Sequence, residues 1–186
     1  MTFVPETHNS ELHLKKIIIT GANGVGKSHF ARELARARPE IPPVSFDAIK
    51  LETGWQQRPR EEIEVALTNE IEKDAWILEG GPSLLHRAIG QADALVWLDP
   101  SEYVRAWRLA KRPWQSFGKT RPELPPGNVD WPWQQYIFAL GSLKKRSTFR
   151  KHISDVFHDA DAVRKWRCQS EGDRRVVIDE WAKVQA

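Results

Sequence analysis

The sequence predicts an α/β fold built on a parallel sheet. Short apolar runs alternate with amphipathic helical stretches along its 186 residues, and this alternation is typical of strands joined by crossover helices. Three of the runs are short and uniformly apolar, as strands covered on both faces are. With 40% hydrophobic and 28% charged residues, the chain has the composition of a folded protein, and its length fits a single domain over 1–186.

Five stretches have the length and composition of strands. The last of them is the most polar, so we expect it at an edge of the sheet. The expected strands are 16–20, 43–46, 75–79, 94–99 and 162–168.

Four helices are expected between these strands. The first, 27–38, places Phe30 and Leu34 on one face and stops before Pro39, which cannot continue it. The second opens at Pro59, with apolar residues recurring at four-residue spacing, and the third covers 83–89. A fourth follows 94–99, with Asp99 as its cap and Pro100 at its first position, where proline is favoured.

Residues 113–132, PWQSFGKTRPELPPGNVDWP, contain five prolines and two glycines. Such a stretch cannot form a regular helix or a central strand. A loop of about 20 residues in a compact domain is either functional or disordered. Because this one carries three aromatic residues, we expect a lid.

The most specific motif is GANGVGKS at 21–28, which fits G-x-x-x-x-G-K-S/T between an apolar run and a helical pattern. Its glycines let successive backbone N–H groups turn toward phosphate oxygens. The helix dipole adds to this field, Lys27 can reach the β and γ phosphates, and the Ser28 hydroxyl can bind Mg²⁺. The alternative is a glycine-rich turn without a ligand. The expected ATP-binding residues are Gly21, Ala22, Asn23, Gly24, Val25, Gly26, Lys27, Ser28 and His29.

The remaining composition limits the other classes of function. Cys168 is the only cysteine, which excludes an internal disulfide and favours a reducing cytoplasm. No secretion signal or membrane span is evident. The net charge of +3, the basic cluster at 143–152 and nine tryptophans leave nucleic acid as an unlikely partner. His152 and His158 flank Asp155 without a spacing suited to a metal.

The chain resembles the adenylate-kinase-like P-loop kinases, and most closely the bacterial topology modulation proteins. The resemblance covers roughly 15–182 and implies a three-layer P-loop NTPase fold. The sheet would have five parallel strands in the order 2-3-1-4-5, with an acceptor-binding segment at about 47–75 and a lid insertion at about 113–132. The motifs that carry it are the loop, SFDAIKLETGWQQRPREE, DAWILEGGPS, ADALVWLDPSEYVRAWRLAKR and GKTRPELPPG.

The same resemblance assigns roles around the loop. Glu79 would lie near Mg²⁺, where these kinases usually have an aspartate, or else be a solvated strand end. Asp47 would be a base, an acceptor contact or a helix cap. Trp55 could stack on an acceptor ring, and Arg58 could bind a phosphate.

Arginines are the other expected site residues. Arg105, Arg108 and Arg112 share one helix face, which is either a solvated stripe or a phosphate-binding face. Arg108 and Arg112 match the arginine pair at the start of the lid in adenylate-kinase-like enzymes, and Arg121 lies in the lid motif. Two further arginines, Arg146 and Arg150, could approach the phosphates or form a plain basic face.

These features together predict a kinase that transfers the γ-phosphoryl group of Mg-ATP to a small acceptor, most simply a nucleoside monophosphate or a related compound. The topology modulation proteins commonly read aspartate-glycine-asparagine-tyrosine at 79–82, where this chain has EGGP, so the acceptor stays open. The alternative is an ATP-binding regulator associated with nucleic acid. The sequence leaves a monomer and a homodimer equally open.

Overall fold

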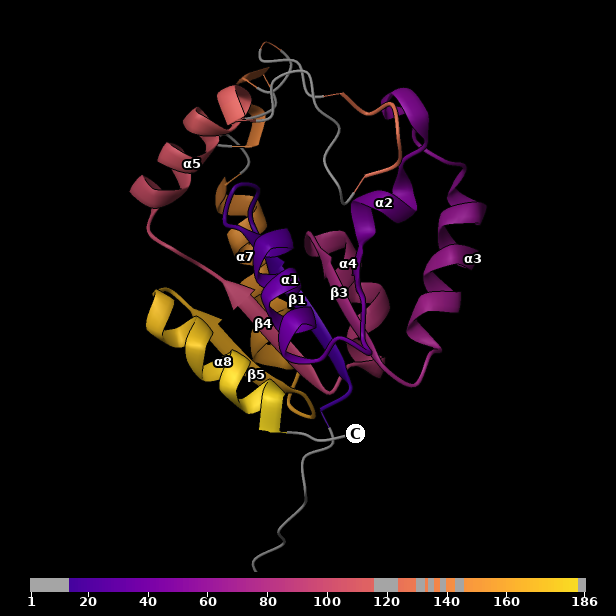
Figure 1. Ribbon diagram of the computed structural model, residues 1–186, viewed down its shortest axis with the longest axis vertical. Coiled ribbons are helices and arrows are strands. Elements are labelled where there is room, and N and C mark those ends of the chain that lie inside the picture. Colours follow the sequence, from indigo (N-terminus) through magenta and orange to yellow (C-terminus); the bar gives the residue numbers. More distant parts are fainter. Residues whose placement is uncertain are drawn as a thin grey trace, which may run out of the picture.

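The fold centres on a five-stranded parallel sheet (Figure 1). The computed structural model describes residues 14–115, 124–129, 133, 136–137, 140–142 and 146–183. The strands follow the order β2-β3-β1-β4-β5, so the predicted order is confirmed and the polar last strand lies at an edge. Their bounds are β1 (Lys16–Gly21), β2 (Pro43–Ser45), β3 (Trp76–Gly80), β4 (Ala94–Leu98) and β5 (Arg164–Cys168).

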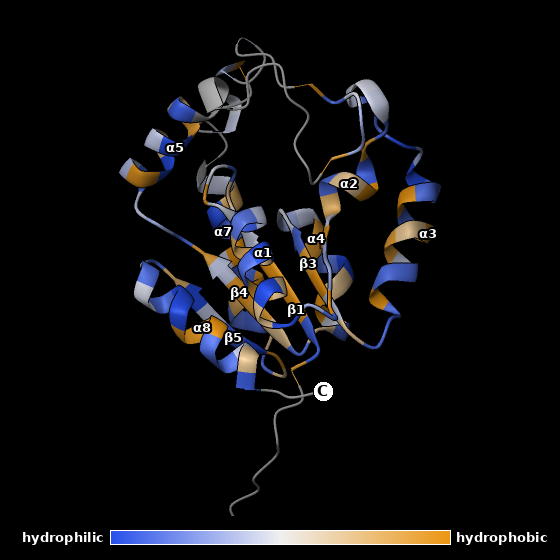
Figure 2. Cartoon of the chain, in the orientation of Figure 1, coloured by the Kyte–Doolittle hydropathy of each residue, from blue (hydrophilic) through white to orange (hydrophobic). Residues whose placement is uncertain are grey.

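Helices cover both faces of this sheet and make three layers (Figure 1). The elements are α1 (Lys27–Ala37), α2 (Phe46–Lys50), α3 (Arg60–Ile71), α4 (Pro82–Ala88), α5 (Glu102–Gln115), α7 (Arg146–Asp159) and α8 (Glu171–Lys183), with short 3-10 turns at Thr53–Trp55 and Ile89–Gln91. Figure 2 shows the strands as the most hydrophobic part, surrounded by helices with hydrophilic outer faces. None of the described helices combines the length and the apolar character needed to cross a membrane.

The alternation of side chains along β1 divides the core into two clusters. Ile17 and Ile19 pack with residues of α1 and α8, whereas Ile18 packs with residues of α2, α3, α4 and α7. This period of two is the geometry of an extended strand. All three isoleucines are fully buried, so β1 holds a fixed register at the centre of the sheet.

Most of the predicted boundaries differ from the structure by one or two residues, and two of the differences have a clear structural reason. The expected strand 43–46 ends at Ser45, because Phe46 begins the short helix α2, which the sequence did not indicate. The helix expected at Asp99 begins only at Glu102. Asp99 instead accepts hydrogen bonds from Arg150 and from Arg167 through its carboxylate, and this long-range ion cluster replaces the expected local cap.

The proline-rich stretch also begins later than expected. Helix α5 runs to Gln115 and therefore includes Pro113 and Trp114. Because proline has no N–H group, Pro113 cannot donate to the carbonyl oxygen of Leu109 and costs this helix one backbone hydrogen bond. Of the expected lid, only 113–115 and 124–129 belong to the described residues.

The C-terminal helix α8 is fixed to α1 by a buried tryptophan. Trp181 is 1% exposed, and its indole Nε1 donates to the carbonyl oxygen of Leu34 at 3.1 Å. The guanidinium of Arg38 lies 4.5 Å from the centre of the indole ring, within the range of a cation–π contact. Helix α8 is therefore held where its first turns approach the loop after β1.

We expect Trp181→Ala to lower the free energy of unfolding by about 3–5 kcal/mol, because it removes a large buried ring and leaves a cavity. Chemical denaturation with circular dichroism measures the change. Trp107, which is 69% exposed on α5, offers a matched control, and Trp107→Ala should change stability by less than about 0.5 kcal/mol. Equal effects of the two changes would show that α8 is not anchored in this way.

Candidate functional site

The loop of residues 22–26 connects β1 to α1 at the carboxyl end of the sheet (Figure 1). Its glycines Gly21, Gly24 and Gly26 have φ angles of 149°, 86° and 97°, a region that other residues rarely adopt. At Gly21 a Cβ atom would lie 2.5 Å from the carbonyl oxygen of Leu98 in the neighbouring strand. A side chain at this position would therefore push the loop away from the sheet.

Lys27 and Ser28 lie in the first turn of α1. The N-cap is Gly26, which has no side chain to bind the first amide groups, so the helix presents unbonded N–H groups and a positive end to an anion. The Lys27 ammonium donates to the carbonyl oxygens of Gly21 at 3.1 Å and Ala22 at 3.3 Å. The Lys27 side chain thus lies over the loop. When an anion binds there, the ammonium can leave the two carbonyl oxygens and bind the oxygens of the anion.

Ser28 and Glu79 form a pair of oxygen ligands beside this loop. The Ser28 hydroxyl donates to Oε1 of Glu79 at 3.0 Å. Glu79 lies on β3 next to Ile19 of β1 and is only 6% exposed, so it is not a solvated strand end. A hydroxyl and a carboxylate are ligands that Mg²⁺ accepts. No group of three or more potential metal-binding side chains exists among the described residues.

A cleft of about 630 Å³ opens in front of the loop. The loop and Lys27 form one wall, the segment from α2 to Gln57 forms the second, and α4 with α7 forms the third. His86 of α4 was not predicted at the site. His152 is exposed, as predicted, and also lines the cleft. The lining residues are Gly21, Ala22, Asn23, Lys27, Asp47, Lys50, Leu51, Trp55, Gln57, Gly81, Pro82, Ser83, His86, Phe149 and His152.

The cleft brings Lys27, Asp47 and Trp55 together from distant parts of the chain. Asp47 is the second residue of α2, whose N-cap is Ser45, so Asp47 is not the N-cap of this helix. Its Oδ1 forms an ion pair with the Lys50 ammonium at 2.7 Å. The structure thus places a carboxylate and the Lys27 ammonium in the lining of the same cleft.

Arg58 lies apart from the lining residues. Its backbone N–H donates to the Lys50 carbonyl oxygen at 2.9 Å. The side-chain Nε is buried and has no hydrogen-bond partner among the described residues. Arg58 therefore does not line the cleft in which an acceptor contact was expected.

Arg105 belongs to the interior rather than to a solvated stripe. Only 1% of it is exposed, and its Nε donates to the Asn23 carbonyl oxygen at 3.0 Å. Its Nη2 donates to the Ser142 hydroxyl at 2.9 Å, and its Nη1 pairs with Glu102 at 3.1 Å. Arg105 therefore fastens α5 to the loop.

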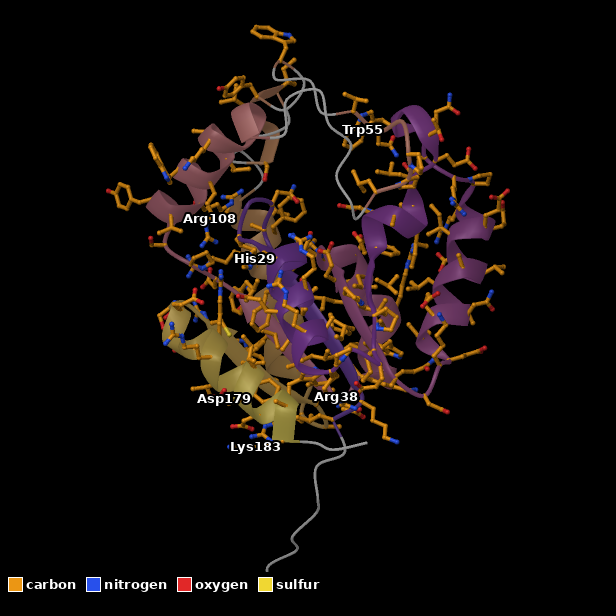
Figure 3. All side chains as sticks on the ribbon, viewed as in Figure 1. His29, Arg38, Trp55, Arg108, Asp179 and Lys183 are labelled. Carbon is orange, nitrogen blue, oxygen red and sulfur yellow. The ribbon has the colours of Figure 1, made fainter. Side chains whose placement is uncertain are left out.

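Two guanidinium groups meet at another loop carbonyl. Arg108 and Arg174 donate to the oxygen of Val25 at 2.7 Å and 3.1 Å, and Figure 3 shows Arg108 between α5 and α1. Burial lowers the pKa of Arg108 from its usual value, the positive charge of Arg174 lowers this pKa further, and Glu171 opposes the change. The site thus concentrates positive charge beside the amino end of α1.

Arg174 was not predicted because it lies 149 residues from Val25 in the sequence and belongs to no motif. His29, predicted to bind ATP, is exposed and forms an ion pair with Glu33 at 3.4 Å when protonated. Arg150 pairs with Asp99 at 2.9 Å. Arg121 and the side chains of Arg112 and Arg146 lie outside the described residues.

Comparisons with known proteins support the fold. No protein-family profile and no curated protein matches the sequence. Similar solved structures include TT1252 from Thermus thermophilus, with 14% identity over 94% of this chain and 100% of that chain and a TM-score of 0.53. A shikimate kinase from Acinetobacter baumannii has 15% identity over 90% of each chain, with a TM-score of 0.49. A gluconokinase from Sinorhizobium meliloti 1021 has 15% identity over 92% and 91%, with a TM-score of 0.48.

At these identities the similarity concerns the fold and not the activity. The sheet of this chain is parallel, and its strand order places β1 at the centre. The glycine-rich loop follows this central strand. The chain therefore has a three-layer P-loop NTPase fold with a parallel sheet in the order 2-3-1-4-5.

Proposed function

We propose that the protein is an ATP-dependent kinase of the adenylate-kinase-like group, nearest to the topology modulation proteins. It would transfer the γ-phosphoryl group of Mg-ATP to a small acceptor, a nucleoside monophosphate or a related small molecule. The observation that carries this proposal is the cleft whose lining combines Lys27, at the start of α1, with Asp47 and Trp55 of a separate segment. A phosphoryl donor and an acceptor need two such adjoining surfaces.

The donor would bind at the loop and the amino end of α1. Lys27 would leave the carbonyl oxygens of Gly21 and Ala22 and bind the β and γ phosphates. Ser28 and Glu79, which are already 3.0 Å apart, would hold Mg²⁺ directly or through water. Bound Mg²⁺ would neutralise charge on the phosphates.

The acceptor would bind at the opposite wall. Asp47 would accept the proton of an acceptor hydroxyl or form a hydrogen bond with it, and Lys50 holds that carboxylate in place. The indole of Trp55 would contact a ring of the acceptor. Arg58 would need to move to reach an acceptor phosphate. Its buried Nε has no hydrogen-bond partner among the described residues, and an unsatisfied buried donor costs free energy, so a new bond to a phosphate would favour this movement.

The arginines would stabilise the charge that develops during transfer. Arg108 lies next to Arg174, so the approach of a phosphate chain would offset the repulsion between the two guanidinium groups. Arg112 and Arg121 would complete this cationic surface from the lid. Because the phosphoryl group moves without a covalent enzyme intermediate, such charge stabilisation and positioning supply most of the rate enhancement.

A screen of acceptors tests the proposal. We expect Mg-ATP to be converted to ADP slowly by the protein alone and at least tenfold faster with one member of a panel containing AMP, adenosine, D-glucose and D-gluconate. In the alternative function, exposed tryptophans such as Trp107 and Trp133 would contact nucleic acid. An unchanged rate across all acceptor classes, together with DNA binding that falls steeply with salt, would replace the kinase proposal by that alternative.

Lys27→Ala should abolish transfer without unfolding the chain, because the half-buried ammonium donates to carbonyl oxygens of the loop rather than packing in the core, and its main task would be to bind phosphates. We expect the rate of ADP formation to fall by at least about 100-fold, with the circular dichroism spectrum and melting temperature nearly unchanged. Normal turnover by folded Lys27→Ala protein would contradict the donor site.

Arg108→Ala should lower kcat by about 100-fold with a much smaller change in the KM for ATP, because the guanidinium would act on charge in the transition state. Steady-state kinetics separates the two effects. Lys111 is an exposed cation on the same helix, so Lys111→Ala should leave both constants near those of the wild type. A raised KM with unchanged kcat would assign Arg108 to ordinary substrate binding.

A further inference from the structure

The segment 50–58, between α2 and α3, is a tight hairpin. The Arg58 N–H donates to the Lys50 carbonyl oxygen at 2.9 Å, and the Glu52 N–H donates to the Gln56 carbonyl oxygen at 2.8 Å. Leu51 and Gln57 form an antiparallel bridge between these bonds. The tip of this hairpin is therefore Thr53–Trp55.

Trp55 has an unusual backbone conformation at this tip. Its φ angle is 62°, and no other non-glycine residue of the described chain has a positive φ. The preceding Gly54 has a φ of 72°. A left-handed conformation is unfavourable for a bulky residue and persists only when surrounding contacts impose it.

Asn128 supplies these contacts from the proline-rich stretch. Its Oδ1 accepts the backbone N–H of Trp55 at 2.5 Å, and its Nδ2 donates to the carbonyl oxygens of Glu52 at 2.9 Å and Pro125 at 3.0 Å. Asn128 is fully buried. An amide is the side chain that can accept one bond and donate two in this arrangement.

The segment 125–129 makes two further contacts with the hairpin tip, Thr53–Trp55. The indole Nε1 of Trp55 donates to the carbonyl oxygen of Val129 at 3.2 Å. Gly127 has a φ of 85°, and a Cβ at this position would lie 2.6 Å from Cγ2 of Thr53. Both the backbone and the ring of Trp55 are thus held by the same short segment.

The hairpin is also the second wall of the cleft. Leu51, Trp55 and Gln57 line it together with Lys27 and Asp47. A wall that must orient a reacting group works best when it is fixed before the substrate arrives. We propose that Asn128 is a positioning residue that fixes Trp55 and so prepares the acceptor wall. This inference rests on the proposed function of the cleft.

The inference also assigns a second task to the stretch that follows α5. Helix α5 contacts the loop through Arg105 and Arg108, and Asn128 contacts the opposite wall 73 residues away in sequence from Trp55. Arg105 and Arg108 thus bond to one wall of the cleft, and Asn128 bonds to the other.

Amide hydrogen exchange, followed by NMR on the full chain, tests the contact. Asn128→Leu keeps the size of the side chain but removes its polar atoms, so we expect the Trp55 amide to exchange at least tenfold faster. Gly127→Ala should have the same effect by displacing the segment from Thr53. Pro126→Ala, at an exposed neighbouring position, should leave exchange within twofold of the wild type.

Kinetics then separates positioning from a merely structural role. With the acceptor from the panel that supports turnover, Asn128→Leu should raise the acceptor KM at least tenfold and change the KM for ATP less than twofold. Mg-ADP binding and thermal unfolding check that each variant is folded.

Three outcomes would overturn the inference in different ways. Unchanged exchange in Asn128→Leu and Gly127→Ala would show that Asn128 does not hold Trp55. Faster exchange with an unchanged acceptor KM would make the contact structural only. Wild-type protein that transfers phosphate to no acceptor would refute the proposed function, and with it this role of Asn128, whatever the exchange result.

Discussion

The site depends on the burial of β1 at the centre of the sheet. Its pairing with β3 on one side and β4 on the other fixes where the strand ends and hence where the loop begins. The same pairing places Glu79 beside Ile19, one strand away from the loop and on the face that carries α1. The Ser28–Glu79 contact is therefore a consequence of strand register. A shift of one residue would turn Glu79 to the opposite face.

A second layer of contacts secures the loop from outside. Arg105 binds the carbonyl oxygen of Asn23, and Arg108 and Arg174 bind that of Val25. Because the C=O and N–H groups of one trans peptide unit point in opposite directions, a carbonyl bound by an arginine turns the amide of the same peptide unit to the other side. Buried arginines are costly unless they are bonded, so these contacts also explain why α5 and α8 are drawn toward the loop.

The second wall of the cleft, the hairpin 50–58, is held in a different way. It lacks the support of the sheet, since Leu51–Gln57 forms only an isolated bridge, and its tip contains a strained tryptophan. Buried Asn128 compensates for this with two hydrogen bonds to the hairpin, to Trp55 and Glu52, while a third bond to Pro125 fixes the asparagine within its own segment. The two walls thus differ in origin: one is held by strand register, and the other by Asn128 and its neighbours in a segment distant in sequence.

The sequence by itself determined the elements that depend on local chemistry. The apolar runs predicted the strands, the spacing in GANGVGKS predicted the loop, and Lys27 and Ser28 followed from that spacing. The strand order came from the family resemblance rather than from periodicity. Tertiary structure alone decided that α5 begins at Glu102 while Asp99 binds Arg150 and Arg167. It also decided that Arg174 meets Val25 and that Asn128 holds Trp55, across 149 and 73 residues. Periodicity and capping report on neighbours within a few turns, whereas a hydrogen bond between distant segments exists only after the chain has packed.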